Sequence, residues 1–409
     1  MKKVLKKIHL WLSVPTGIVI TLVCFSGAML AFEKEITEAI KPELYFVKDA
    51  KGEPIPMQQL MEKVEETLPD SVSISGVTVF ADSTRTYQVS LSKPRRASIY
   101  VNQYTGEVTG RSERLPFFNT MFHLHRWLLG SSSGVGKLLT GICALALAFI
   151  LVTGILMWLT NRNKPLKASL AIHVTKGWGR FWHDLHVAGG IYATIFLLAM
   201  ALTGLTWSFS WYRNGFYACF GVESSERSGA HGEGGNSHGE GRDSHGEGRN
   251  NHEGKRDEGR GEGRGEGRGN EFYHEGGYHE EGYGFHRRSP YRHWDDVLNE
   301  VALKNPSYRQ ITLKPEVAEV VPEGRLSMRA TDKYSYDRRS GEITDVQLYS
   351  AGKKDTKVRS GIYMVHTGSW GGIITRILNF LAALIGATLP LTGYWLWIRR
   401  LTRKRHQQA

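Results

Sequence analysis

Four long apolar runs alternate with polar segments along the chain. Each run exceeds the roughly 20 residues that an α-helix needs to cross the hydrocarbon core of a bilayer. They cover Leu10–Phe32, Leu138–Thr160, Val187–Trp211 and Ile373–Ile398. Their interiors are almost free of charge, apart from Arg376 in the first turn of the last run. The pattern therefore predicts four transmembrane helices.

Basic residues gather at three flanks of these runs. They precede the first run, separate the second from the third and follow the fourth: Lys2, Lys3, Lys6, Lys7; Arg162, Lys164, Lys167, Lys176, Arg180; and Arg399, Arg400, Arg403, Lys404, Arg405. The positive-inside rule places these segments in the cytoplasm. This placement also accounts for much of the net charge of +12 without a nucleic-acid partner. Because the first run is longer than a signal-peptide core of roughly 7–15 residues, we interpret it as an uncleaved span.

Both long connections then lie outside the membrane, and both have the pattern of a small α+β module. The first has helical spacing followed by three alternating runs, at Met57–Leu68, Val77–Phe80, Thr86–Leu91 and Ala97–Val101. The second predicts a matching helix and three strands, at Trp294–Leu303 and near 309–313, 325–330 and 333–337. Each connection is expected to fold as an extracytoplasmic domain.

The second connection also contains a low-complexity segment, 229–284, made almost wholly of Gly, His, Glu and Arg. Four histidines recur in it at a regular interval: His231, His238, His245 and His252. Such a composition cannot bury a core, so we predict disorder. It is interpreted either as an expanded linker or as a tract that captures metal weakly.

The two halves of the chain repeat the same spacings. His9 precedes Ser26-Gly27 by the same interval that separates His186 from Thr203-Gly204, and Lys137 precedes Thr153 as Arg376 precedes Thr392. Repetition at this scale indicates an internal duplication. The small pairs are expected to let helix backbones approach closely.

The predicted fold is therefore a membrane protein with four transmembrane α-helices and two extracytoplasmic α+β domains. Along the chain, the first span with its basic N-terminus covers 1–32, the first outer domain 33–137 and the second span 138–160. A cytoplasmic loop follows at 161–186, then the third span at 187–211 and the second outer domain, which contains the insert, at 212–372. The fourth span covers 373–398 and the cytoplasmic tail 399–409.

Four histidines lie at the mouths of the apolar runs, with His9 and His186 on the cytoplasmic side and His125 and His366 outside. Neutral imidazole is a good axial ligand for haem iron, and helical bundles build cofactor sites from facing helices. We predict two bis-histidine haem b groups, one in each leaflet. They are bound non-covalently, because no Cys-x-x-Cys-His motif occurs.

Other residues compete for, or complete, these sites. His123 and His183 are alternative ligands, or they orient the first set through hydrogen bonds. Lys137 and Arg376 hold equivalent places at the outer surface. They either pair with haem propionates or anchor their helices at the membrane interface.

Four motifs in the chain resemble those of PepSY-associated transmembrane proteins. They are Lys7-Ile-His9-Leu-Trp-Leu, Phe122-His-Leu-His125-Arg-Trp-Leu, Phe181-Trp-His-Asp-Leu-His186-Val-Ala-Gly-Gly and Val365-His366-Thr-Gly. The turns at 100–108 and 336–343, which contain Thr-Gly-Glu-Val and Ser-Gly-Glu-Ile, look like the PepSY signature. The resemblance covers nearly the whole chain except the insert.

This resemblance implies a multi-pass protein of the bacterial inner membrane, with cytoplasmic termini and periplasmic PepSY domains. Characterised members are similar to di-haem reductases of iron–siderophore complexes, so the implied enzyme is a haem-dependent ferric-chelate reductase. Its partners would be a ferric siderophore or other Fe(III) chelate, membrane lipid, and a quinol or separate cytoplasmic electron donor. The chain itself lacks a dinucleotide fingerprint.

Two other functions fit the same sequence. One is a non-catalytic membrane module whose PepSY domains bind or restrain a periplasmic partner. The other is a metal-handling protein in which the His-rich segment does the binding.

Overall fold

The computed structural model describes residues 2–94, 97–160, 169–222 and 289–406. The predicted disordered segment at 229–284 lies outside these residues, as do Arg162, Lys164 and Lys167 between the second and third spans.

Four long helices correspond to the four predicted spans: α1 (Lys2–Leu30), α6 (Val135–Leu159), α9 (Gly190–Ser208) and α13 (Gly372–His406). Each is long and apolar enough to cross a membrane. The third span begins earlier than predicted, because the short helix α8 (Trp178–Asp184) and a π-helical turn, η1 (Leu185–Gly189), lead into α9 without a break. The chain is thus a multi-pass membrane protein.

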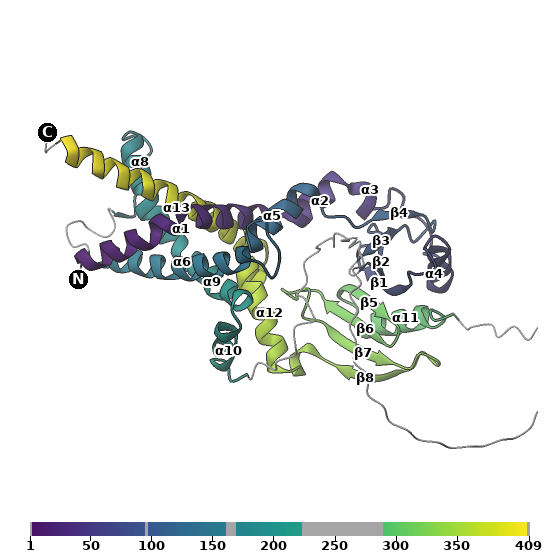
Figure 1. The fold of residues 1–409 in the computed structure, drawn as a ribbon. Coiled ribbons are helices and arrows are strands. Elements are labelled where there is room, and N and C mark those ends of the chain that lie inside the picture. Colours follow the sequence, from purple (N-terminus) through teal and green to yellow (C-terminus); the bar gives the residue numbers. More distant parts are fainter. Residues whose placement is uncertain (1, 95–96, 161–168, 223–288, 407–409) are drawn as a thin grey trace, which may run out of the picture. The chain divides into compact units, whose positions relative to one another are not determined.

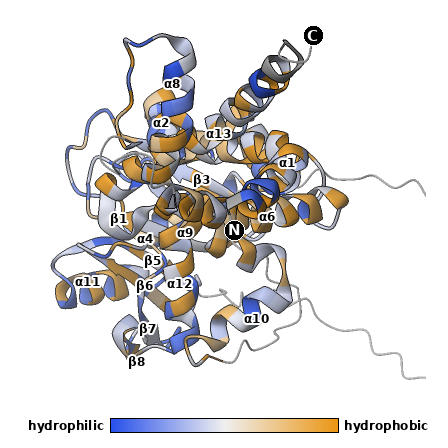
Figure 2. Ribbon diagram, turned by 90° about the vertical axis from the view of Figure 1, so that its left-hand side faces the viewer, coloured by the Kyte–Doolittle hydropathy of each residue, from blue (hydrophilic) through white to orange (hydrophobic). Residues whose placement is uncertain are grey.

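The four spans form a bundle in which α1 and α9 each contact both α6 and α13 (Figure 1). Small residues permit this packing: a Cβ on Gly386 would lie 2.7 Å from Cδ2 of Leu197. On the outside of the bundle, Trp11 is 76% exposed and Ile195 is 71% exposed, and apolar residues recur along the helices (Figure 2). Such surfaces require apolar surroundings, which a bilayer supplies.

The polar connections contribute eight strands to one antiparallel sheet, in the order β4-β3-β2-β1-β5-β6-β7-β8. The first connection supplies β1 (Ile74–Phe80), β2 (Tyr87–Leu91), β3 (Ser98–Val101) and β4 (Val108–Arg111). The second supplies β5 (Tyr308–Lys314), β6 (Val317–Pro322), β7 (Asp332–Tyr336) and β8 (Ile343–Gln347). Strands β1 and β5 join the two sets, with Val77 opposite Leu313 and Val79 opposite Ile311.

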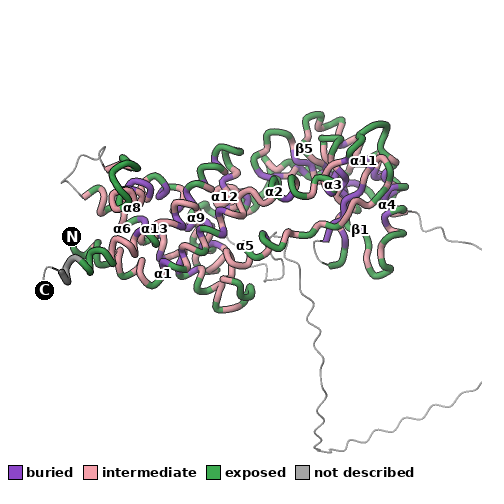
Figure 3. The backbone as a smooth tube through the Cα atoms, turned by 90° about the horizontal axis from the view of Figure 1, so that it is seen from above, coloured by how far each residue is buried: buried purple, intermediate pink, exposed green. Residues whose placement is uncertain are grey.

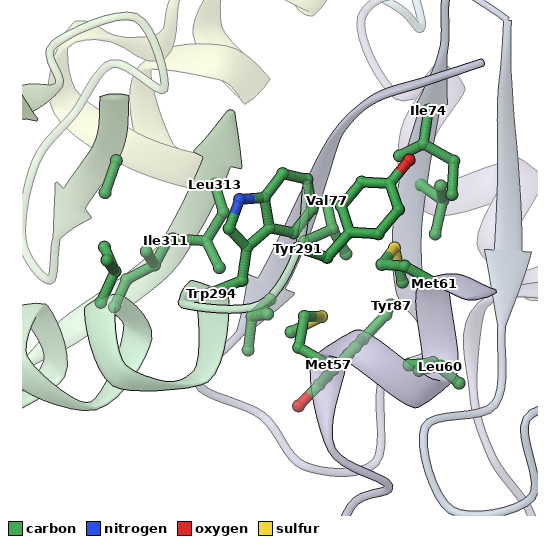
Figure 4. Packing of buried hydrophobic residues seen from close by; sticks show 14 of the residues in the cluster. Met57, Leu60, Met61, Ile74, Val77, Tyr87, Tyr291, Trp294, Ile311 and Leu313 are labelled. Carbon is green, nitrogen blue, oxygen red and sulfur yellow. The ribbon is translucent and has the colours of Figure 1, made fainter. Parts of the chain in front are cut away.

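The two sets of strands also share one hydrophobic core with helices α4 (Met57–Glu66) and α11 (Trp294–Lys304). Trp294 and Tyr291 from the second connection pack near Met57 and Met61 from the first (Figure 4). Buried segments occur in α4, α11 and β1 (Figure 3). The structure therefore joins the two predicted outer modules through a continuous sheet and a common core, instead of separating them as two domains.

Two strands differ from the sequence prediction. The predicted strand at 325–330 is wrong: the strand is β6, which ends at Pro322. A turn then follows in which Gly324 has a φ of +76°. The edge strands β4 and β8 were not predicted, because both are short and β8 is mostly exposed, so neither has the alternation that marks a half-buried strand.

Short helices connect the spans to the sheet: α2 (Glu33–Ile40), α3 (Pro42–Tyr45), α5 (Pro116–Trp127), α10 (Ser210–Ala218) and α12 (Lys354–Thr367). Helix α2 carries three acidic residues, each paired with an arginine of another segment: Glu33 with Arg114, Glu35 with Arg376, and Glu38 with Arg85. These ion pairs link α2 to the span α13, to the segment before α5 and to the loop between β1 and β2.

Candidate functional site

The structure brings the four predicted histidine ligands together in two pairs. The rings of His9 and His186 have centres 6.4 Å apart and planes at 85°. The rings of His125 and His366 have centres 6.1 Å apart and planes at 57°. We call the first the termini-side pair, because it lies at the bundle end where the chain begins and ends, and the second the sheet-side pair. All four side chains are partly buried.

Local structure places each histidine. His9 lies in the first turns of α1, and His186 lies in the π-helical turn before α9. Turns of this kind are frequent at functional sites. His125 and His366 lie near the ends of α5 and α12, which are not themselves spans. Both helices end at a residue with positive φ, Leu128 at 49° and Gly368 at 75°, and the chain then enters the next span.

In the termini-side pair, a threonine of a neighbouring span contacts Nδ1 of each ring. The distance from His9 Nδ1 to Thr153 Oγ1 is 3.0 Å. His186 Nδ1 lies 2.9 Å from Thr392 Oγ1 and 3.1 Å from the carbonyl oxygen of Leu389. Each ring is therefore fixed by a helix other than its own.

The sheet-side pair is held in a similar way. His366 Nδ1 lies 3.0 Å from the carbonyl oxygen of Met200 and 3.2 Å from Thr203 Oγ1. His125 Nδ1 lies 2.9 Å from the carbonyl oxygen of Val23. These partners belong to α9 and α1, so α12 and α5 are each attached to a span through the histidine.

These contacts determine where the proton of each ring resides. A carbonyl oxygen only accepts hydrogen bonds, so Nδ1 of His125, His186 and His366 must donate. The hydroxyl of Thr153, the partner of His9, donates to the carbonyl oxygen of Ile150 at 2.9 Å and accepts from Nδ1. Nε2 then keeps its lone pair in all four rings. No hydrogen bond reaches these Nε2 atoms from the described residues, and an imidazole in this state is ready to bind a metal.

Each ring also rests against a glycine, a feature that the sequence did not reveal. A Cβ added to each glycine would lie close to Cε1 of a ring. The distances would be 2.8 Å from Gly27 to His125, 3.2 Å from Gly204 to His366, 3.4 Å from Gly393 to His186 and 3.6 Å from Gly154 to His9. In each case the glycine and the histidine belong to different segments that pack on each other, so the close approach expected at these Ser/Thr-Gly pairs is made to an imidazole. The repeated spacing was the only signal of this role.

Burial affects the charge of the sheet-side pair. Removal from water lowers the pKa of His125, and it lowers the pKa of His366 to about 3. Both rings are therefore neutral at pH 7, which is the form that coordinates a metal.

The alternative ligands point elsewhere. The ring of His123 packs against Trp127, with centres 5.0 Å apart. His183 is exposed, and its Nδ1 lies 3.2 Å from a carboxylate oxygen of Asp184. Neither His123 nor His183 is brought into either pair.

Lys137 and Arg376 differ in their surroundings. Arg376 donates to both carboxylate oxygens of Glu35, at 2.7 and 2.9 Å, and to the carbonyl oxygen of Ala31 at 2.6 Å. Its charge is therefore already compensated. Lys137 has no ion pair with any described residue.

Within the described part of the chain, no group of three or more His, Cys, Asp or Glu is placed to hold a metal ion. Each histidine pair thus offers two nitrogen ligands, which suits a metal whose other ligands come from a prosthetic group.

Comparison with known proteins identifies the family. A family model described as the PepSY-associated TM region matches residues 6–400, nearly the full length of the chain. A search of curated proteins gave no match. The chain belongs to the PepSY-associated transmembrane family.

Proposed function

We propose that the chain binds two haem b groups, one on each histidine pair, and carries electrons across the membrane to Fe(III) chelates. The observation that supports this most strongly is the spacing of the rings. A metal held by one nitrogen of each ring, with bonds of about 2 Å, puts the ring centres roughly 6 Å apart. The centres lie 6.4 and 6.1 Å apart.

When bound, bis-histidine haem supplies one-electron transfer without an open coordination position. The four histidines would hold the two haem irons through Nε2. The hydrogen bonds at Nδ1 prevent the rings from rotating, and the glycines leave room for them. Trp207 packs edge-on against His366, with ring centres 4.8 Å apart, and supports that ring from α9.

The proposed orientation follows from the basic flanks. With the termini in the cytoplasm, the termini-side pair would face a quinol or a cytoplasmic donor, and the sheet-side pair would face the periplasm of the bacterial inner membrane. A quinol releases two electrons and two protons, so one quinol reduces two Fe(III) to Fe(II). The hard oxygen donors of a siderophore hold Fe(II) less tightly, so reduction releases the metal.

A pyridine haemochromogen assay on the purified protein tests this proposal. We expect two haem b per chain. His9→Ala and His186→Ala should each remove one centre, and His125→Ala and His366→Ala should each remove the other. His123→Ala is the matched control and should keep both, because its ring packs on Trp127.

Two results would contradict the proposal. Purified protein without haem would exclude it and would favour a module that binds a periplasmic partner. A single haem per chain would exclude the paired arrangement. The reductase activity itself is tested in proteoliposomes with a quinol and an Fe(III)–hydroxamate outside, by the appearance of Fe(II) in a colorimetric chelator. The double variant H125A/H366A should abolish that signal.

A further inference from the structure

Arginines packed on aromatic rings lie beside both histidines of the sheet-side pair. In α5, Arg126 follows His125 directly, and its guanidinium carbon lies 5.4 Å from the ring centre of Trp127 and 5.5 Å from that of Phe122. Because the rings of His125 and His366 have centres 6.1 Å apart, α5 and α12 meet at this point. The arginine of α5 therefore lies next to the pair.

The corresponding arginine at α12 comes from another segment. Tyr363 precedes His366 by three residues, so the two side chains lie on the same face of the helix, one turn apart. Arg329, in the segment between β6 and β7, places its guanidinium carbon 3.9 Å from the centre of the Tyr363 ring. Arg359 is exposed and lies on the same face, seven residues before His366. Two guanidinium groups thus lie along the face of α12 that ends at His366.

The topology of the chain does not account for these cations. The positive-inside rule gathers Lys and Arg in cytoplasmic segments, and in the proposed orientation the sheet-side pair lies on the other side of the membrane. Arg114 and Arg376, at the same end of the bundle, have a structural role, because each is paired with a glutamate of α2. Arg126 and Arg329 are placed differently, against aromatic rings. Their placement calls for another explanation.

An arginine on an aromatic ring is arranged to bind a carboxylate. The ring contacts the face of the guanidinium, whereas a carboxylate binds to the N–H groups at its edge, so one contact does not block the other. The ring also holds the guanidinium in one orientation, which reduces the entropy lost on binding. Two such groups beside one histidine pair favour a ligand with several carboxylates and a net negative charge.

We propose that Arg126 and Arg329 form a binding site for Fe(III) chelates that carry carboxylates and a net negative charge, the class to which ferric citrate belongs. Arg359 extends this site along α12. The inference rests on the proposed function and narrows its substrate, since a neutral hydroxamate complex offers no carboxylate to these arginines. The propionates of a haem offer the same carboxylate chemistry, and the experiment below separates the two sources.

Gallium(III) citrate tests binding apart from electron transfer, because Ga(III) resembles Fe(III) in charge and size and is not reduced. Equilibrium dialysis against the purified holoprotein should show that Ga(III) citrate binds more tightly than a neutral Ga(III) trihydroxamate. Arg126→Gln and Arg329→Gln should each weaken binding of the citrate complex roughly 10-fold, the loss expected for one charge-assisted contact. The hydroxamate complex should bind these variants as it binds the wild type. Affinity for the citrate complex should also fall as the ionic strength rises.

Arg339→Gln is the matched control. It removes the same charge from an exposed arginine in the turn between β7 and β8, and it should leave both affinities unchanged. Arg329→Lys separates charge from geometry, because lysine keeps the charge but cannot make the bidentate contact, and it should retain only part of the affinity. In the proteoliposome assay, Arg126→Gln and Arg329→Gln should raise the KM for Fe(III) citrate by the same factor as they weaken binding.

Equal affinity for the citrate and hydroxamate complexes would overturn the site, and so would an equal weakening by Arg339→Gln. Loss of the sheet-side haem from Arg126→Gln or Arg329→Gln would assign that arginine to a propionate and overturn its place in the site. Protein that contains no haem, but prefers Ga(III) citrate in this arginine-dependent way, would contradict the proposed function and support the binding site.

Discussion

Replacing Gly27 by alanine should weaken haem binding at the proposed site on the sheet-side pair more than the same change at any of the other three glycines. The added Cβ would lie 2.8 Å from Cε1 and 3.0 Å from Nδ1 of His125. To regain an ordinary contact, the ring must retreat by more than half an ångström. Its hydrogen bond to Val23, now 2.9 Å, would be stretched or lost.

The size of the effect follows from these contacts. Overpacking of this kind costs about 1–3 kcal/mol, and the lost hydrogen bond adds about 0.5–1.5 kcal/mol. If the ring gives way partly, haem affinity at this centre should fall roughly 5- to 150-fold, the equivalent of about 1–3 kcal/mol. Gly204→Ala, with a contact of 3.2 Å, should have a smaller effect. Gly393→Ala and Gly154→Ala, at 3.4 and 3.6 Å, should have almost none.

The assay must report on the centre and not on the fold. Alanine is the better helix former by about 1 kcal/mol, so each substitution can raise helix stability while it displaces the ring. Equilibrium transfer of haem to a competing apoprotein measures affinity directly, and the four variants control for one another. The reasoning fails if Gly154→Ala weakens haem binding as much as Gly27→Ala, or if Gly27→Ala leaves it unchanged.

Three further predictions concern stability, each measured by thermal or denaturant unfolding in detergent. The guanidinium of Arg376 donates to Glu35 and holds the pKa of that carboxyl below its ordinary value of 4.5. Because the pair is half-exposed, it contributes less than about 1 kcal/mol to the free energy of unfolding. This stabilisation is present above pH 4.5 and is lost as the pH falls through the lowered pKa of Glu35. Glu35→Gln should lack this pH dependence. Asp295→Ala leaves the backbone N–H of Met57 without its carboxylate and should cost about 1–3 kcal/mol, and unchanged stability would mean that water replaces the bond. Trp294→Ala should destabilise the shared outer core by about 3–5 kcal/mol, whereas a loss below about 1 kcal/mol would show that the two halves of the sheet do not depend on a common core.

The sequence alone specified the features that depend on short stretches of chain. The length and apolar character of the four runs determine that they are membrane helices, and the structure has all four. The helices at Met57 and Trp294 follow from apolar spacing on one face. The positions of the four histidines relative to the runs also indicated how they would be paired, which is the pairing that the structure has.

Only the tertiary structure decided the contacts between residues far apart in the chain. The union of the outer modules through β1 and β5 is one example, because strand pairing across more than 200 residues leaves no local pattern. The pairing of Arg376 with Glu35 is another. The glycine contacts of the four imidazoles, and the threonine contacts of His9, His186 and His366, are a third. Hydrogen bonds and close approach are set by the packing of one helix on another and not by the residues on either side.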